Sequence, residues 1–158
     1  MSSVRSIVPP DFEAVLPALN FVDSIELTVP HKTGSYDFTK HIMASMPAWV
    51  GRLLHLRNAL MAPLGLHTVE APGTREKFGM FPVISSDEAR TVLGFDDKHL
   101  DFRIILDAAP LAGSTKLTLS TAVRTHNMFG RAYLAVVMPF QKLIVRTMLG
   151  RAATLGNR

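Results

Sequence analysis

Two segments of this chain alternate strictly between apolar and polar side chains, and this alternation constrains the fold more than any other feature. In the first segment, 99–107, the apolar positions are Leu100, Phe102, Ile104 and Leu106. In the second, 115–126, the positions expected on one side are Leu117, Leu119, Thr121 and Val123. Because successive side chains of a β-strand point to opposite faces, both segments are predicted to be strands with one buried face. A turn at 110–114 would join them into an antiparallel hairpin.

Three further segments have the character of strands. Residues 21–29 alternate in the same way, with Ile25, Leu27 and Val29 on one side. Residues 77–85 and 89–95 are shorter, and Pro82 suggests that the first of these is an edge strand. The short connections between the later segments predict an antiparallel meander.

Helical periodicity predicts three helices. The first covers 37–46, and the second begins at Pro47, in the first turn of a helix, where proline is tolerated. The apolar positions of the second recur every three or four residues: Trp49, Leu53, Leu56 and Leu60. The last helix follows Asn127, a suitable N-cap, and Pro139 predicts a kink within it. Its predicted apolar stripe comprises Phe129, Tyr133, Val137, Phe140, Ile144 and Met148.

This order of elements predicts an α+β fold of the helix-grip type, in which a curved antiparallel sheet wraps around a long C-terminal helix. The apolar face of the sheet and the apolar stripe of the helix can each cover the other. The 158 residues fit one domain, 1–158, whose Pro-containing segment 1–20 is expected to be irregular and to lie on the surface.

Composition narrows the classes of function. The chain has no cysteine, which excludes thiol catalysis and suits a reducing compartment, so a cytoplasmic location is expected. No apolar run reaches the roughly 18 residues that a membrane span requires. The net charge of +4 comes from scattered basic residues rather than from a dense basic patch with aromatic side chains, so no nucleic-acid partner is expected.

Three sequence segments, LGFDDKHLDFR, THNMFGRAY and MPFQKLIV, are similar to a known family, and the similarity covers about residues 40–150. The chain resembles an uncharacterised bacterial family, the domain of unknown function DUF2867. The resemblance implies a place near the START-like, or SRPBCC, superfamily of birch-pollen-allergen-like proteins, which has the helix-grip fold. It implies no activity, cofactor or catalytic residue. Gln141 stands where a histidine is expected after Pro139-Phe140.

The segment 96–101 gathers carboxylates and a histidine that could in principle bind a metal ion. In the hairpin registers that fit a turn at 110–114, Asp97 lies opposite Arg124 or His126, and His99 lies opposite Ala122 or Arg124. All of these residues would lie on the outer, solvated face, where cross-strand ion pairs contribute less than about 1 kcal/mol each. We therefore predict surface ion pairs and no metal site, and His126 and Asn127 are interpreted as junction residues.

The apolar interior is the remaining candidate, because no catalytic motif such as GxSxG, HExxH or GxGxxG occurs. We expect a small apolar or amphipathic ligand in a cavity between the sheet and the last helix, with Tyr133 as its polar anchor. The residues expected to line this cavity are Trp49, Phe81, Phe102, Leu119, Tyr133, Val137 and Phe140. The same residues could equally form an ordinary packed core.

Two other functions stay open. An enzyme of the cyclase or hydratase type would need an inward titratable residue, for which Tyr133, Asp96 and Asp23 are the candidates. A homodimeric interaction module would use the outward face of the meander, with Asp101, Arg103 and Arg124. No cofactor is expected for any of the three. The sequence does not decide whether a reaction is catalysed.

Overall fold

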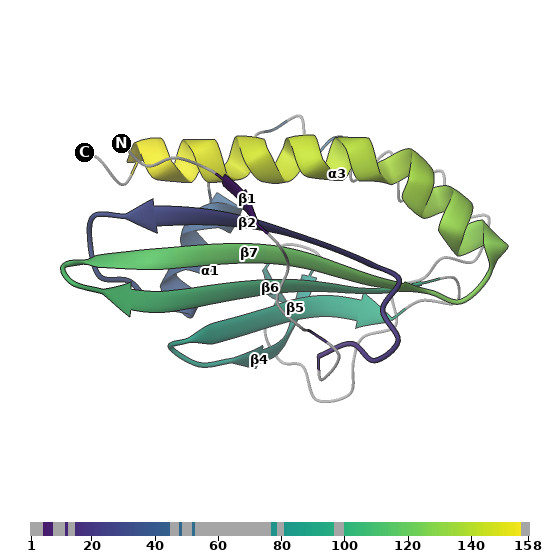
Figure 1. Cartoon of the computed structure of the whole chain (residues 1–158), viewed down its shortest axis with the longest axis horizontal. Coiled ribbons are helices and arrows are strands. Elements are labelled where there is room, and N and C mark those ends of the chain that lie inside the picture. Colours follow the sequence, from purple (N-terminus) through teal and green to yellow (C-terminus); the bar gives the residue numbers. More distant parts are fainter. Residues whose placement is uncertain are drawn as a thin grey trace.

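The computed structural model describes residues 5–7, 12, 15–44, 48, 52, 77–78, 81–96 and 100–155. In this part of the chain, helices pack against an antiparallel sheet (Figure 1). The strands are β1 (Arg5–Ile7), β2 (Phe21–Val29), β3 (Lys77–Phe78), β4 (Phe81–Ser86), β5 (Arg90–Asp96), β6 (Leu100–Leu111) and β7 (Ser114–Thr125). The helices are α1 (Ser35–Ala44) and α3 (Met128–Leu155). The predicted mixed class with an antiparallel sheet is confirmed. The predicted second helix lies outside the described residues except for Ala48 and Arg52, which are helical.

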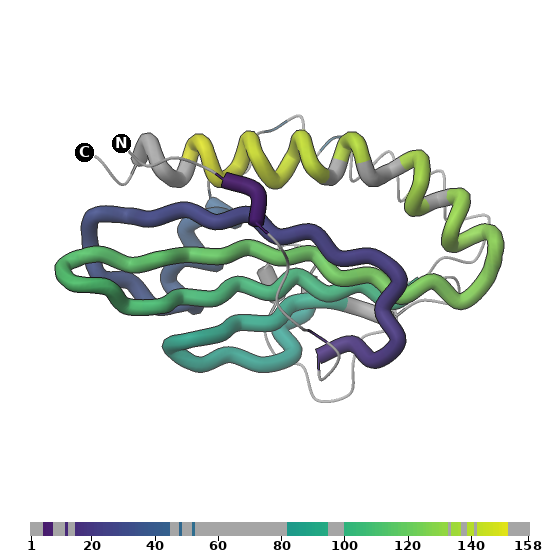
Figure 2. Tube along the Cα trace, in the orientation of Figure 1, coloured from purple at the N-terminus to yellow at the C-terminus, as the bar shows by residue number. Residues whose placement is uncertain are grey.

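The strands lie in the order β1-β2-β7-β6-β5-β4-β3, and every paired neighbour is antiparallel. The meander from β4 to β7 is therefore present as predicted. β2 joins it from far away in sequence, and its trace follows β7 over its whole length (Figure 2). Among the described residues, no helix is both long enough and apolar enough to cross a membrane.

The β6–β7 hairpin is tighter than the sequence suggested. Leu111 pairs with Ser114, so the turn consists of Ala112 and Gly113 alone, and Gly113 adopts a φ of 73°. Such a two-residue turn needs positive φ, which glycine adopts without a steric penalty. The predicted alternation of faces is correct, but the predicted register is wrong. Arg124 pairs with Asp101, and not with Asp97 or His99.

The main core lies on the inner face of the sheet, between the strands and both helices. From the strands come Ile25, Leu27, Val29, Leu93, Ile104, Leu106, Leu117 and Leu119, and from the helices come Phe38, Ile42, Val145, Met148 and Leu149. Of the predicted stripe of α3, Met148 lies in this core and Ile144 packs against it, whereas Phe129 and Phe140 are exposed. Apolar residues occur on more than one side of α3, so periodicity alone did not determine which side is buried.

The N-terminal segment covers the opposite, outer face of the sheet. Phe12 and Leu16 are buried there against Val92, Ile105 and Ala122. The first strand, β1, adds to the edge of the sheet beside β2. The expectation of an irregular segment lying on the surface therefore needs correction, because this segment supplies a strand and the cover of a second apolar cluster.

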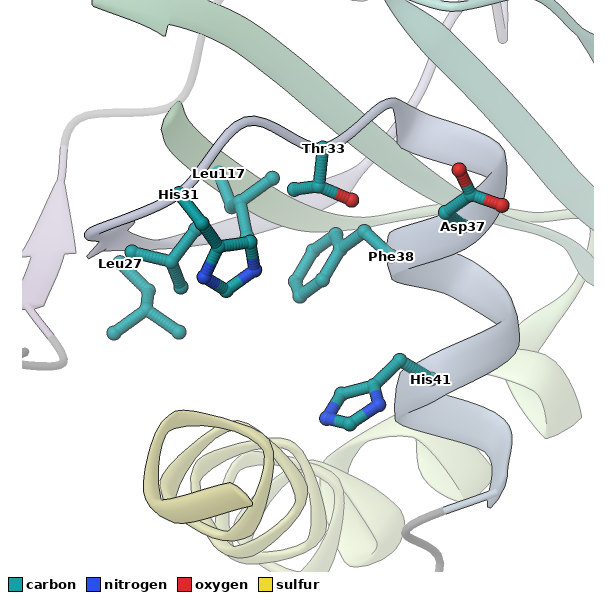
Figure 3. Close-up of a pocket in the computed structure, with 8 residues that line it drawn as sticks. Leu27, His31, Thr33, Asp37, Phe38, His41 and Leu117 are labelled. Atoms are coloured by element: carbon teal, nitrogen blue, oxygen red, sulfur yellow. The ribbon is translucent and has the colours of Figure 1, made fainter. Parts of the chain in front are cut away.

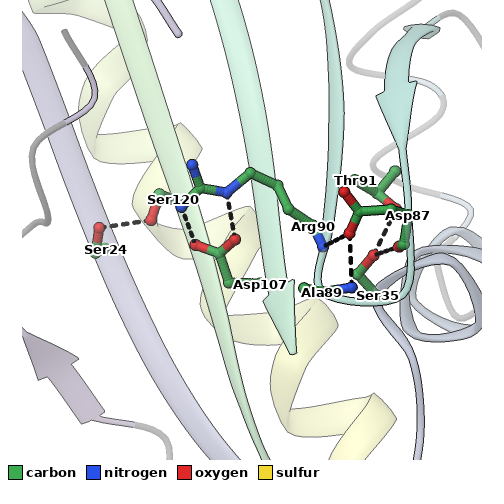
Figure 4. Close-up of polar contacts among 8 residues, drawn as sticks. All are labelled: Ser24, Ser35, Asp87, Ala89, Arg90, Thr91, Asp107 and Ser120. Atoms are coloured by element: carbon green, nitrogen blue, oxygen red, sulfur yellow. Dashed lines mark hydrogen bonds and ion pairs between the residues drawn. The ribbon is translucent and has the colours of Figure 1, made fainter. Parts of the chain in front are cut away.

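Polar contacts fix the start of α1 against the turn between β4 and β5 (Figure 4). The Ser35 hydroxyl donates to the Asp87 carbonyl at 2.5 Å and lies 2.8 Å from the Thr91 hydroxyl. The Ser35 amide donates to the Glu88 carbonyl at 2.8 Å. These bonds hold α1 over the inner face of the sheet, where it forms one wall of a cavity.

Candidate functional site

A cavity of about 220 Å³ lies where β2 ends, next to the start of β7 and the inward side of α1 (Figure 3). The residues that line it are Leu27, Val29, His31, Thr33, Asp37, Phe38, His41 and Leu117. They come from three elements and from the turn that joins β2 to α1. α3 passes beside the opening, as Figure 3 shows.

The floor of this cavity is apolar. Leu27 and Val29 are alternate residues of β2, and Leu117 is the cross-strand partner of Leu27 on β7. All three face inward because of strand alternation, and Phe38 of α1 packs above them in the same core. Each of these four side chains is at least 95% buried. The floor is therefore an extension of the hydrophobic core rather than a surface dent.

The mouth of the cavity is polar. His31 and Thr33 follow β2, while Asp37 and His41 are four residues apart and share one side of α1. The imidazole rings of His31 and His41 both lie next to Phe38 and point towards the open space beside α3 (Figure 3). Both histidines are solvent-exposed. Imidazole can donate or accept a hydrogen bond, so this mouth can bind the polar end of a molecule.

One buried hydroxyl holds the turn that carries His31 and Thr33. The Thr115 Oγ1 donates to the His31 carbonyl at 2.9 Å, and the Thr33 amide donates to the same Oγ1 at 3.1 Å. Thr115 is itself buried in the first residues of β7. The position of His31 relative to the floor is therefore fixed by the sheet.

The residue types at this cavity suit a small amphipathic molecule. A volume of about 220 Å³ is below the roughly 300–1,000 Å³ of drug-sized pockets, so it fits a small molecule or one end of a longer one. A metal centre is not indicated: nowhere in the described ranges do three or more His, Asp or Glu side chains gather closely enough to hold an ion.

Three of the residues predicted to line a cavity, Phe102, Leu119 and Phe140, are not among the described residues that line this one. Leu119 is buried in the main core, and Phe102 packs at the edge of that core and against the cluster of Leu100 and Val123. Phe140 lies on the exposed side of α3. Trp49 and the side chains of Phe81, Tyr133 and Val137 lie outside the described part of the structure, so their role in binding stays a prediction.

Sequence reasoning missed the polar mouth. His31 and His41 are not among the residues that the sequence predicts at a site, because each lies outside the alternating strands. The sequence feature that could have linked the two histidines is their spacing: they lie ten positions apart, across a predicted strand, turn and helix. A helix that folds back over the strand it follows brings such residues to the same end of the sheet, which the sequence alone did not reveal.

A second cavity, of about 420 Å³ and more open, lies at the opposite end of β7. Its lining residues are Asn20, Phe21, Thr125, Arg131, Leu134 and Ala135. The Asn20 Oδ1 accepts hydrogen bonds from the Thr125 amide at 2.7 Å and the Thr125 hydroxyl at 3.0 Å. The Asn20 Oδ1 is thus already used to join the residue before β2 to the end of β7.

Among the described residues of the segment 96–101, Asp101 has a buried carboxylate. Its side chain is only 3% exposed, and it lies between Arg124 and His126. The Arg124 Nε donates to Oδ2 at 2.9 Å, Arg124 Nη2 donates to the same oxygen, and His126 Nε2 lies 2.9 Å from Oδ1. Burial raises the pKa of Asp101, but the hydrogen bonds from His126 and Arg124 outweigh it and lower the pKa below its ordinary value.

This cluster corrects the prediction of solvated ion pairs on the outer face. Arg124 Nη1 also donates to the Pro17 carbonyl at 3.0 Å, so the N-terminal segment passes over the cluster. A carboxylate bound to one nitrogen of an imidazole can orient a catalytic histidine. Neither cavity described above includes Asp101 or His126, however, and the cluster connects β6, β7 and the N-terminal segment structurally.

Comparison with known proteins gives a family but no activity. A family model described as "Protein of unknown function (DUF2867)" matches residues 15–148. None of the curated proteins compared with the chain matches it.

Three solved structures are similar at low identity. The protein TTHA0849 from Thermus thermophilus has 11% identity and a TM-score of 0.41, covering 86% of this chain and 97% of its own. A conserved protein from Geobacillus kaustophilus has 7% identity and a TM-score of 0.42, with coverages of 87% and 95%. CalU16 from Micromonospora echinospora has 10% identity and a TM-score of 0.32, with coverages of 96% and 92%.

Proposed function

We propose that this chain, which belongs to the family of proteins of unknown function DUF2867, binds a small apolar or amphipathic molecule in the cavity beneath His31 and His41. One observation carries the proposal: an apolar floor that is continuous with the core opens at a mouth with two imidazoles. The apolar part of the ligand would lie on Leu27, Val29 and Leu117. Its polar end would meet the histidines.

The energetic case rests on the burial of apolar surface. Removing apolar area from water is favourable by about 25 cal/mol per Å², so even a short alkyl or aromatic group gains affinity on such a floor. The polar mouth then sets orientation, because a polar group pushed into the floor would lose its hydrogen bonds to water. A molecule with one apolar and one polar end satisfies both parts of the cavity.

We further propose that the domain, 1–158, is a helix-grip domain of the START-like, or SRPBCC, superfamily. The order of elements supports this: β1, β2 and α1 come first, the antiparallel meander follows, and α3 comes last. α3 also contributes Val145, Met148 and Leu149 to the core beneath the sheet. A cytoplasmic location is proposed with it, because the chain has no cysteine.

Binding is tested with a fluorescent fatty acid of short chain length and with native mass spectrometry of the purified protein. We expect a co-purified small molecule, or saturable binding of the probe. The substitution Val29→Phe should abolish binding, because the larger side chain fills the floor. Lys32→Ala, a change in the same exposed turn that leaves the cavity intact, should bind as the unchanged protein does.

The histidines provide the second arm of this test. His31→Ala and His41→Ala should weaken binding of the fatty acid more than binding of an alkane of equal length, because only the fatty acid has a polar end. Equal binding by the Val29→Phe variant, with its fold verified by circular dichroism, would overturn the proposal.

An enzyme of the cyclase or hydratase type is the second candidate. Asp37 and His41, which share one side of α1 at the cavity, are the observation that favours it, because they provide titratable groups at a site that can hold a substrate. Turnover of a bound ligand that is lost in His41→Ala would support this candidate. A homodimer also stays a prediction, although Asp101 is buried and is not available on an exposed dimer face.

A further inference from the structure

The outward side of α3 exposes a stripe of large apolar side chains. Val136, Phe140 and Leu143 recur at spacings of four and three, so they lie along one side of the helix. Val136 is 68% exposed, and Phe140 and Leu143 are each 56% exposed. Phe129, seven residues before Val136, extends the same line. Single exposed apolar residues are common, but an aligned set indicates an interaction surface.

The charges on α3 are all of one sign. The helix carries Arg131, Lys142, Arg146 and Arg151, all exposed, and no Asp or Glu from Met128 to Leu155. Two of these cations lie on the side of α3 that faces the first strands. Lys142 Nζ is 6.0 Å from the centre of the Phe21 ring, and Arg146 Nη2 donates to the Ser6 hydroxyl at 3.2 Å. The apolar stripe therefore has a basic border.

We infer that this side of α3, the stripe of Val136, Phe140 and Leu143 with its border of Lys142 and Arg146, docks on an anionic lipid surface. Apolar side chains flanked by Lys and Arg are characteristic of helices that lie in the plane of a membrane interface. The apolar residues enter the boundary of the acyl chains while the cations meet the negative headgroups. This inference is independent of the ligand proposed for the cavity.

The charges on α3 favour an anionic lipid surface over a second copy of the chain as the partner of this stripe. Two α3 helices packed together would bring arginine and lysine side chains close to one another without a carboxylate from either helix. A lipid surface instead supplies negative charge along the whole helix, and it accepts a convex ridge of side chains without needing a matching groove. Each basic residue near such a surface contributes attraction that is lost at high salt.

Flotation with vesicles tests the inference. The intact protein should bind vesicles of phosphatidylcholine mixed with phosphatidylserine, and should bind vesicles of phosphatidylcholine alone much more weakly. Lys142→Gln and Arg146→Gln should each weaken binding about fivefold. Phe140→Ser and Leu143→Ser should weaken it by at least as much, and all four positions are exposed, so the fold is expected to persist.

Matched controls lie elsewhere on the surface. Leu111→Ser changes an exposed apolar residue of the β6–β7 hairpin, and Lys32→Gln changes an exposed cation next to β2. Both should bind the mixed vesicles as the unchanged protein does. The inference is overturned if the intact protein does not bind the mixed vesicles, if Phe140→Ser binds them normally, or if sedimentation shows a dimer that Phe140→Ser dissociates.

Discussion

At the scale of single residues, Asp101 has the most demanding environment in the described structure. Its carboxylate is nearly inaccessible to water, and it is bound by a guanidinium from β7 and by an imidazole from the residue pair that leads into α3. A buried charge is tolerated only when such partners compensate for the loss of water. This one side chain therefore links β6, the end of β7 and, through Arg124, the N-terminal segment.

Replacing Asp101 with asparagine keeps the shape of the side chain and removes its charge. We expect Asp101→Asn to lower the free energy of unfolding by about 2 kcal/mol at neutral pH, the size of a charged hydrogen bond. Because the folded pKa of Asp101 is lowered, its contribution is present above the unfolded pKa of about 3.9 and is lost as the pH falls through the folded pKa. Urea unfolding at neutral and acidic pH measures the difference. A gap between the two proteins that stays constant into acid would contradict this account.

Gly94 lies so close to the backbone of the neighbouring strand that a larger residue would not fit. It lies in β5 opposite Arg103, and a Cβ atom built on it would be 2.1 Å from the Phe102 carbonyl oxygen. No rearrangement of a flexible side chain can relieve a contact with backbone. Gly94→Ala is expected to destabilise the protein by about 1–3 kcal/mol, measured as a lower midpoint of urea unfolding. Gly150→Ala is the control, because a Cβ there meets nothing within 4 Å.

At the scale of elements, the side chain of Asn127 caps the start of α3. Asn127 Oδ1 accepts a hydrogen bond from the Gly130 amide at 2.9 Å, which is the geometry of an N-cap three residues before the bonded amide. The predicted N-cap is thus confirmed. Asn127→Ala should lower the free energy of unfolding by about 1 kcal/mol, whereas Asn127→Asp should retain most of it. Thermal unfolding followed by circular dichroism distinguishes the two variants.

The elements that were predicted well are those whose pattern is local. The alternation in β2, β6 and β7 correctly identified their buried faces, because each residue needs only its neighbours to define a side. The hairpin register was wrong because it depends on the turn, and the conformation of Gly113 was not part of the pattern. The buried side of α3 was predicted only in part: Met148 and Ile144 contribute to the core as predicted, whereas Phe140 is exposed and the equally apolar Val145, on another side of the helix, is buried.

The candidate site was less predictable than the fold for a related reason. The floor residues Leu27 and Leu117 were expected to face inward, and they do. The mouth depends on how the chain between β2 and α1 turns back over the sheet, and the Thr115 hydroxyl that fixes this turn lies more than eighty positions away in sequence from His31. Contacts of that range leave no periodic trace in a single sequence.

At the scale of the whole molecule, the sheet has two covered faces rather than one. The inner face packs on α1 and α3, and the outer face packs on the N-terminal segment, for which no sequence pattern had indicated a structural role. Cross-strand polar pairs lie on the same outer face: Arg90 Nε donates to Asp107 Oδ1 at 2.5 Å, and the buried hydroxyls of Ser24 and Ser120 are 2.7 Å apart (Figure 4). The outer face therefore combines an apolar cluster with polar cross-strand pairs.

Phe12 is a residue of the N-terminal segment that packs on the outer face of the sheet, so replacing it tests whether this segment stabilises the fold. Its ring is buried against Val92, Ile105 and Ala122, and the guanidinium of Arg90 lies 5.5 Å from the ring centre. Phe12→Ala should lower the free energy of unfolding by about 3 kcal/mol, as is typical for a buried phenylalanine. Phe140→Ala removes the same side chain from an exposed position and should cost no more than about 0.5 kcal/mol. If both variants unfold at the same urea concentration, the N-terminal segment does not contribute to the folded core, and the outer face of the sheet is stable without it.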